Sequence, residues 1–196
     1  IYKFAKYNEF KSANIIFHGG EPLLIDTNIY SSAIDFAMSN FKDINFRWCI
    51  QTNAFKLNEK IIQFLKKYNV NVGVSIDGGK DSHNKVRVCE NGYKTYDRVW
   101  NNIVTLKENR IPCSAIMVLS SISLENSLDY LYKYADYNIP LKINPLINCG
   151  DVLNNSYLEL QKYDYANYLI KVYKFILENN IDLNISPINK MMRAII

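Results

Sequence analysis

Short apolar runs alternate with longer amphipathic segments along this 196-residue chain. The short runs are rich in Val and Ile, which favours strands covered on both faces. In the longer segments apolar residues recur every three or four positions, as on the buried side of a helix. The pattern predicts strands at 15–18, 47–52, 70–76, 114–119 and 141–145, and a short one at 181–185. It predicts helices at 28–40, 58–68, 96–109, 124–137, 158–179 and 189–196.

Polar residues mark where two of these helices begin. Asn58 precedes the second helix, and Ser123 or Glu125 precedes the fourth. Such side chains accept hydrogen bonds from the free N–H groups of a first helical turn. We therefore predict that they act as N-caps.

The succession of strand, helix and strand with short connections predicts an α/β fold with a parallel sheet. Right-handed crossovers let such a sheet curl into an open or closed barrel. Ligands of these folds bind where the strands end at their carboxyl side. We expect residues 1–196 to form a single domain, because no linker, repeat or low-complexity stretch interrupts the pattern.

Composition excludes several classes of function. Hydrophobic residues make up 48% of the chain, but no apolar run is long enough for a membrane span. The net charge of +4 is spread among interspersed lysines and acids, so no basic stripe predicts nucleic-acid binding. The chain starts at Ile1 without a secretory leader, and we expect a cytoplasmic piece of a longer protein.

The four cysteines are Cys49, Cys89, Cys113 and Cys149, and no two of them have the short spacing of a metal-binding pair. We therefore predict no metal site in these residues. Isolated thiols in a reducing compartment are the simpler interpretation.

Three unusual segments fall at the carboxyl ends of three successive predicted strands. They are Gly19-Gly20-Glu21-Pro22, Gln51-Thr52-Asn53 and Ser75-Ile76-Asp77-Gly78. Glycine lacks a Cβ, so a small molecule with a free amino group could approach the backbone carbonyls closely. In a parallel barrel the three segments converge on one mouth, which predicts a single polar pocket.

The order and spacing of these segments resemble the radical S-adenosylmethionine enzymes. The similarity is greatest to the anaerobic sulfatase-maturase and peptide-modifying (SPASM) branch. It extends from Ser75-Ile76-Asp77-Gly78 through a loop with His83 and Arg87 to the helix at Tyr96-Asp97-Arg98-Val99. The Asn144-Pro145-Leu146 strand end and the long helix after it are also similar, so the resemblance covers nearly the whole chain.

This resemblance implies a partial (β/α)6 TIM-type barrel that lacks its first strand and its cluster-binding loop. Residues 1–196 would then form one incomplete radical S-adenosylmethionine core domain. It also implies cofactor contacts. The turn of Gly19, Gly20, Glu21 and Pro22 would accept hydrogen bonds from the methionyl ammonium, and Glu21 would add negative charge there.

The other implied contacts involve side chains. Gln51 and Asn53 would lie near the ribose hydroxyls, Ser75 near the methionyl carboxylate, and Asp77 would hold its strand end. His83 and Arg87 would approach the peptide substrate or the cofactor.

The family's chemistry implies the cofactors and partners. A reduced [4Fe–4S] cluster cleaves S-adenosylmethionine to a 5′-deoxyadenosyl radical, which takes a hydrogen atom from a protein or peptide side chain. Oxidation of Cys or Ser to formylglycine in a sulfatase is one candidate reaction, and crosslinking of ribosomal peptides is another. Flavodoxin or ferredoxin would donate the electron.

Several residues depart from the family pattern. The three-cysteine cluster loop is absent, since no cysteine precedes Cys49, and we expect the chain alone to be inactive. The sequence also stops about where the cysteine-rich extension of this branch would be expected to begin. Ala54 stands where glycine commonly follows the amide pair, and Gly79 stands where proline commonly follows Asp-Gly.

Other interpretations stay open at this point. The chain could be a scaffold that binds S-adenosylmethionine or a peptide without cleaving either. It could also be a barrel enzyme with acid–base chemistry through Glu21, Asp77 and His83. His83 could be purely structural, Asp77 could begin a plain turn, and Arg87 could pair with Glu90.

Overall fold

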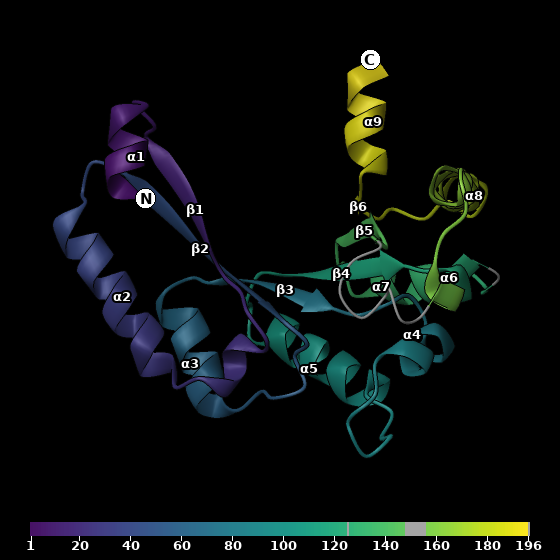
Figure 1. Cartoon of the computed structure of the whole chain (residues 1–196), viewed down its shortest axis with the longest axis horizontal. Coiled ribbons are helices and arrows are strands. Elements are labelled where there is room, and N and C mark those ends of the chain that lie inside the picture. The colour runs from purple at the N-terminus through teal and green to yellow at the C-terminus, as the bar shows by residue number, and fades with distance from the viewer. Residues whose placement is uncertain (125, 148–155, 196) are drawn as a thin grey trace. The chain divides into compact units, whose positions relative to one another are not determined.

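The computed structural model describes residues 1–124, 126–147 and 156–195 (Figure 1). Their strands are β1 (Ser12–Phe17), β2 (Asn45–Thr52), β3 (Asn71–Ser75), β4 (Cys113–Leu119), β5 (Leu141–Pro145) and β6 (Ile185–Ser186). The α-helices are α1 (Tyr2–Tyr7), α2 (Thr27–Asn40), α3 (Glu59–Lys67), α4 (Lys80–Val86), α5 (Tyr96–Glu108), α6 (Ser121–Leu124), α7 (Tyr130–Asp136), α8 (Asp164–Glu178) and α9 (Ile188–Ile195). Two 3-10 turns are η1 (Pro22–Leu24) and η3 (Ser156–Leu158).

The strands form a six-stranded sheet whose spatial order follows the chain order, β1 to β6. The pairs β1–β2, β2–β3, β4–β5 and β5–β6 are parallel. This confirms the predicted parallel α/β fold. The five main predicted strands are present, and the sixth is shorter and later than predicted, at Ile185–Ser186.

Two helical regions differ from the prediction. The helix expected at 158–179 begins only at Asp164. The helix expected at 124–137 is divided into α6 and α7, and the Ser127 hydroxyl accepts a hydrogen bond from the Asp129 N–H at 3.1 Å between them. Such local side-chain bonds compete with helix formation. Ser123 lies inside α6, so its predicted N-cap role is wrong, and Glu125 lies outside the described residues. Asn58 does cap α3, because its Oδ1 accepts from the Ile61 N–H at 3.0 Å.

The described residues divide into two compact units, each treated separately below. The first is Ile1–Val74 with Asn101–Cys113, and the second is Ser75–Trp100 with Ser114–Ile196. Among the described residues, no helix combines the length and apolar character needed to cross a bilayer.

Aromatic side chains join the sheet to the helices in the first unit. The Phe17 ring on β1 lies 4.6 Å from the Tyr30 ring on α2 and stacks on Trp48 of β2 at 6.2 Å between centroids. Tyr30 in turn lies 5.9 Å from Phe64 of α3. Aromatic pairs at these distances stabilise a core beyond their buried area alone. Helices α2 and α3 therefore cover the sheet face that carries Phe17 and Trp48.

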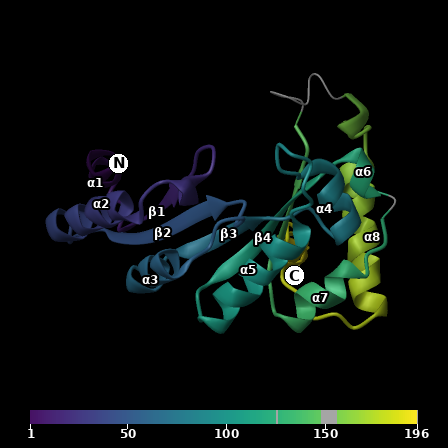
Figure 2. The ribbon, with the colours of Figure 1, turned by 90° about the horizontal axis from the view of Figure 1, so that it is seen from below.

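A second aromatic core fills the other unit. Helices α7 and α8 lie side by side there (Figure 2), and the hydroxyls of Tyr130 and Tyr168 are 2.8 Å apart. Tyr134, which is fully buried, lies 5.2 Å from the Trp100 ring. The Lys133 ammonium lies 4.2 Å from the same indole, in cation–π geometry. This core also contacts the third predicted strand end, because the Tyr134 hydroxyl donates a hydrogen bond to the Gly78 carbonyl.

Candidate functional site

The strand end after β1 is open to solvent. Gly19 and Gly20 are both exposed, and a Cβ built on either would meet no atom within 4 Å. Gly19 has a φ of +143°, a backbone conformation that side chains disfavour. A ligand can therefore reach this backbone without displacing any side chain.

The Glu21 carboxylate ties the end of β1 to the end of β2. Its Oε1 accepts hydrogen bonds from the Leu23 N–H at 2.9 Å and from the Thr52 hydroxyl at 2.5 Å. Its Oε2 accepts from the Asn53 N–H at 2.7 Å. Bonds from neutral donors to an ionised carboxylate are stronger than those between neutral groups. The structure thus brings the first two predicted segments together, and Glu21 fixes their spacing.

Pro22 belongs to the same arrangement. It is buried, begins η1, and its carbonyl accepts a hydrogen bond from the Tyr30 hydroxyl at 2.9 Å. Proline suits this first helical position because its missing N–H would have no partner there. Pro22 therefore holds the open turn against α2.

The Gln51-Thr52-Asn53 segment presents two of its side chains and buries the third. Gln51 is partly exposed and Asn53 is exposed, whereas Thr52 is 2% exposed. Thr52 also accepts from the Ala54 N–H at 2.9 Å. The sequence predicted no role for Thr52. Strand alternation places it on the face opposite Gln51 and Asn53, and this was the signal that it is buried.

Ala54 adopts a backbone conformation that favours glycine. Its φ is +51°, in the left-handed region. This agrees with the observation that glycine commonly stands there in the family that the sequence resembles. The Ala54 carbonyl accepts a hydrogen bond from the Asn102 amide at 2.8 Å, which holds the strained turn in place.

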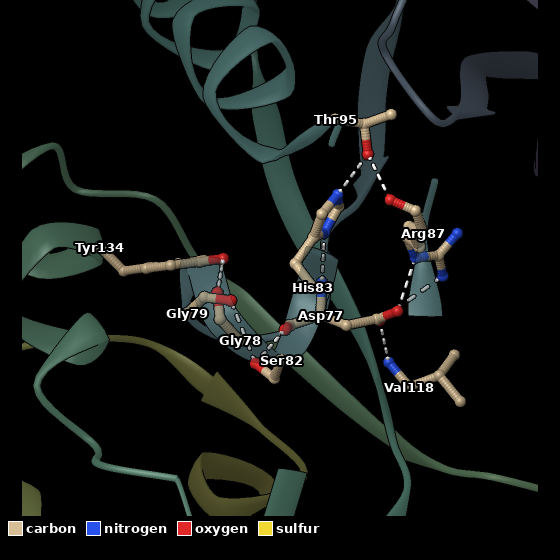
Figure 3. Close-up of polar contacts among 9 residues, drawn as sticks. All are labelled: Asp77, Gly78, Gly79, Ser82, His83, Arg87, Thr95, Val118 and Tyr134. Atoms are coloured by element: carbon tan, nitrogen blue, oxygen red, sulfur yellow. Dashed lines mark hydrogen bonds and ion pairs between the residues drawn. The ribbon is translucent and has the colours of Figure 1, made fainter. Parts of the chain in front are cut away.

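Asp77 is the centre of the third segment, which lies in the second unit (Figure 3). It is 3% exposed, and its Oδ2 accepts from Arg87 Nε at 2.6 Å. Its Oδ1 accepts from the Val118 N–H of β4 at 2.8 Å. Asp77 thus joins the β3 end to β4, as the resemblance implied, and Arg87 pairs with it rather than with Glu90.

The ion pair with Asp77 engages only part of the Arg87 guanidinium. Its side chain is 32% exposed, and Nε and Nη2 both point to the Asp77 carboxylate. Among the described residues no atom accepts a hydrogen bond from its Nη1. Arginine offers five N–H donors in a fixed plane, so part of this guanidinium is available to an anion.

His83 has a structural environment. It is 0% exposed, its Nδ1 accepts from the Asp77 N–H at 3.2 Å, and its Nε2 lies 2.9 Å from the Thr95 hydroxyl. That hydroxyl donates to the Arg87 carbonyl at 2.7 Å, so Nε2 carries the proton and the imidazole is neutral. Burial lowers the pKa of His83 to about 4, and the Arg87 charge acts in the same direction against an opposing effect of Asp77.

This environment corrects one expectation from the sequence. The predicted polar loop at His83 is the helix α4, whose buried residues are Ser82 and His83. Both ring nitrogens of His83 are bonded inside the protein, which favours a structural role for this residue over contact with a substrate. Arg87 is partly exposed, so it can still contact a substrate or the cofactor.

The glycines after Asp77 are closed in, unlike those after β1. A Cβ on Gly78 would lie 3.1 Å from Ser82 Oγ and 3.4 Å from the Met117 methyl group. The Tyr134 hydroxyl donates to the Gly78 carbonyl at 3.2 Å, and the Ser82 hydroxyl donates to the Asp77 carbonyl at 2.8 Å (Figure 3). Ser75, at the end of β3, is partly exposed. The convergence of this segment with the first two stays a prediction, because they belong to different units.

The residues fit the two implied cofactors unequally. The open Gly19-Gly20 backbone suits a ligand with an ammonium group, as S-adenosylmethionine has. In contrast, no group of three His, Cys, Asp or Glu side chains among the described residues could hold a metal ion. Cys49, Cys89 and Cys113 are free thiols, and Cys149 lies outside the described residues. The described residues therefore do not hold a [4Fe–4S] cluster.

The parallel sheet and its helices place the chain among the α/β proteins, a class in which ligands commonly bind at the carboxyl ends of the strands. Residues 1–140 match the family model of the radical SAM superfamily. This chain therefore belongs to the radical SAM superfamily, whose members use S-adenosylmethionine and a [4Fe–4S] cluster.

Curated relatives point to one branch of the superfamily. The cysteine-type anaerobic sulfatase-maturating enzyme of Clostridium novyi is 28% identical over 177 residues, which cover 88% of this chain and 47% of that enzyme. The serine-type enzyme of Bacteroides thetaiotaomicron is 30% identical over 113 residues, 58% of this chain and 27% of that enzyme. The chain thus spans less than half the length of these relatives.

Solved structures show the same fold. The native structure of anSMEcpe with bound AdoMet has a TM-score of 0.78 at 22% identity, and covers 94% of this chain and 52% of that one. Its complex with AdoMet and the Kp18Cys peptide has a TM-score of 0.75 at 22% identity, and covers 89% and 50%. At this identity the likeness supports the fold alone.

Proposed function

We propose that this chain is the S-adenosylmethionine-binding part of an enzyme that modifies a protein or peptide side chain by radical chemistry. The observation that carries the proposal is the open Gly19-Gly20 turn, held to the end of β2 by the Glu21 carboxylate. Relatives that are named as sulfatase-maturating enzymes support the choice of substrate class. Formylglycine formation from Cys or Ser is the specific reaction that we propose.

Each residue of the open turn has a defined task in this proposal. The carbonyls of Gly19 and Gly20 accept hydrogen bonds from the methionyl ammonium of S-adenosylmethionine. Glu21 and Pro22 hold the turn in position, and Glu21 places negative charge near two cationic groups of the ligand. Gln51 and Asn53 then contact the ribose hydroxyls.

The third segment supplies the remaining contacts. Ser75 binds the methionyl carboxylate, and Asp77 keeps the strand end in place through Val118 and Arg87. The free part of the Arg87 guanidinium binds an anionic group of the cofactor or of the peptide. All these residues orient ligands and exclude water, and none of them acts as a nucleophile or a base.

A bound [4Fe–4S] cluster would supply the electron that cleaves S-adenosylmethionine to a 5′-deoxyadenosyl radical. Since the described residues do not hold such a cluster, we infer that the chain binds the cofactor but does not turn it over by itself. The electron would come from a donor such as flavodoxin or ferredoxin.

Isothermal titration of the full chain with S-adenosylmethionine tests the proposal. Gly20→Val should weaken binding by about a hundredfold or more, because its side chain fills the space that the methionyl group needs, a cost of about 3 kcal/mol. The fold should be unchanged, because a Cβ at Gly20 meets nothing within 4 Å. Ser12→Val is the matched control, since Ser12 is exposed at the opposite end of β1. Equal affinity of the wild type and Gly20→Val would contradict the proposal.

A further inference from the structure

One face of the sheet in the first unit is left uncovered by α2 and α3. These helices pack on the face that carries Phe17 and Trp48. Side chains alternate between the two faces of a strand, so every second residue of β2, counted from Arg47, points away from α2 and α3. In the described first unit this face comprises Ser12, Asn14, Ile16, Asn45, Arg47, Cys49, Gln51, Asn71 and Gly73, and we call it the open face.

The open face is polar but nearly uncharged. Most of its residues are exposed, and Ile16 is 59% exposed. Arg47 is the single ionised side chain among the described residues of this face. It takes part in no salt bridge between described residues. An arginine in the middle strand of three, without an acidic partner, is a strong candidate for binding an external anion.

Strand register defines the immediate surroundings of Arg47. Asn14 of β1 is its direct partner, and Cys49 is two residues further along β2. Neighbouring strands lie about 4.8 Å apart, so the Asn14 amide and the Arg47 guanidinium can bind one small group together. The Arg47 charge acts on the Cys49 thiol by lowering its pKa, against the larger raising effect of burial, which also indicates that the two side chains are near each other.

Arg47 lies far from the proposed cofactor contacts. Gln51 lies four positions further along β2, which at about 3.3 Å per residue is roughly 13 Å. S-adenosylmethionine held at Gly19 and Gly20 would occupy the carboxyl end of β1 and β2. An anion bound at Arg47 would therefore belong to a different molecule.

We propose that Arg47 and Asn14 form a binding site for a carboxylate group of the peptide substrate. This proposal rests on the proposed function, which makes a peptide the second ligand. A carboxylate carries one charge and matches the single guanidinium, which can bind both of its oxygens in a fork. A phosphate group carries nearly two charges and would leave one of them without a partner on this face.

Alkylation of Cys49 gives a test that needs no catalytic activity. Two short serine-containing peptides are compared, one with glutamates beside the serine and one with glutamines in their place. Each is added to the full chain, and the iodoacetamide labelling of each thiol is followed by mass spectrometry. The glutamate peptide should slow labelling of Cys49 about tenfold at a concentration where the glutamine peptide slows it little, because hydrogen bonds between two charged groups are stronger than those to a neutral amide. Cys89, which belongs to the other unit, serves as the internal reference.

Variants make the outcome specific. Arg47→Gln should remove the difference between the two peptides, whereas Lys11→Gln should preserve it. Lys11 is the matched control, because it is an exposed cation next to β1 that alternation places on the covered side. Equal protection by both peptides, or a difference that survives in Arg47→Gln, would overturn the proposal.

Two further results separate this site from the cofactor site. Protection of Cys49 by S-adenosylmethionine alone would also overturn it, because the anion would then be the cofactor's own. Peptide protection that persists in Gly20→Val would support the Arg47 site even if S-adenosylmethionine binding failed. The failure of one proposal is therefore distinguishable from the failure of the other.

Discussion

Two strand ends in this protein combine a pair of glycines with an acid, but the glycines are exposed at one strand end and enclosed at the other. After β1, Gly19 and Gly20 are exposed and the acid follows them. After β3, Asp77 comes first, and a Cβ on Gly78 would lie 3.1 Å from Ser82 Oγ. The first turn leaves room for a ligand, whereas the second leaves room only for the protein's own side chains.

The acids, in contrast, do the same work in both turns. Glu21 joins the end of β1 to Thr52 and Asn53 at the end of β2, and Asp77 joins the end of β3 to Val118 on β4. Each carboxylate therefore fixes the distance between neighbouring strand ends. The comparison shows that an acid beside paired glycines does not identify a ligand site, and that the open space around the glycines does.

Removal of the more deeply buried acid, Asp77, should reduce stability the most. Asp77→Ala should lower the free energy of unfolding by about 3–4 kcal/mol, because it leaves Arg87 and the Val118 N–H without their partner. Glu21→Ala should cost about 1–2 kcal/mol, because Glu21 is less buried and Asn53 is exposed to water. Urea unfolding measures both, with the exposed Asp81→Ala as control. Equal losses at the two positions would mean that burial of the acid does not determine its contribution to stability.

The closed turn should also make stability depend on pH through His83. Its pKa is about 4 in the folded chain and about 6.5 in the unfolded chain, so the unfolded state binds the proton first as pH falls. The contribution of neutral His83 to the free energy of unfolding is therefore present above pH 6.5 and is lost progressively between pH 6.5 and 4. From pH 7 to pH 5 the free energy of unfolding should fall by about 2 kcal/mol.

The variant His83→Gln isolates this effect. It should be less stable than the wild type at pH 7 but nearly independent of pH between 7 and 5. His18, the only other histidine of the chain, is exposed and stays present in both proteins. Parallel pH profiles for the wild type and His83→Gln would contradict the assignment of a neutral, buried imidazole.

Alanine substitutions at the two turns measure how much space surrounds each glycine. Gly78→Ala should destabilise by about 1–2 kcal/mol, because its φ is +67° and the new Cβ would crowd Ser82 and Met117. Gly20→Ala should change stability by less than about 0.5 kcal/mol, as expected for exposed surface positions. Thermal unfolding of both variants checks this. A loss at Gly20 that matches the loss at Gly78 would mean that the first turn is closed as well.

The smallest expected effect concerns Ala54, next to the open turn. Ala54→Gly should relieve the strain of a positive φ, a gain of about 1 kcal/mol, and lose the packing of one buried methyl group. We expect a net change of no more than about 0.5 kcal/mol in either direction. Chemical unfolding gives the value, and a loss above about 2 kcal/mol would show that Ala54 has a packing role beyond its backbone.

Hydrophobic periodicity predicted most of the fold. The Val- and Ile-rich runs gave five of the strands, and the amphipathic spacing gave α2, α3 and α5, because these elements bury regular apolar faces. Helix α4 was missed because its buried side consists of Ser82 and His83, which are polar. Helix α4 is stabilised by hydrogen bonds at the strand end, which cannot be predicted from a hydropathy pattern.

The candidate site was predictable in its segments but not in its internal bonds. Gly19, Gly20 and Asp77 could be selected from strand ends and glycine chemistry. The bond between Glu21 and Thr52 joins residues 31 positions apart, and the relay from His83 through Thr95 to Arg87 depends on folded geometry. Whether Glu21 faces a ligand or the neighbouring strand is likewise decided by packing.

Hydrogen–deuterium exchange of the full chain, with and without saturating S-adenosylmethionine, locates the cofactor site. If the cofactor binds at the open turn, exchange becomes slower for peptides that contain Gly19, Gly20 and Asn53 and changes little at Gly78, which is already enclosed. Unchanged exchange at Gly19 and Gly20 in the presence of bound S-adenosylmethionine would show that the cofactor binds elsewhere.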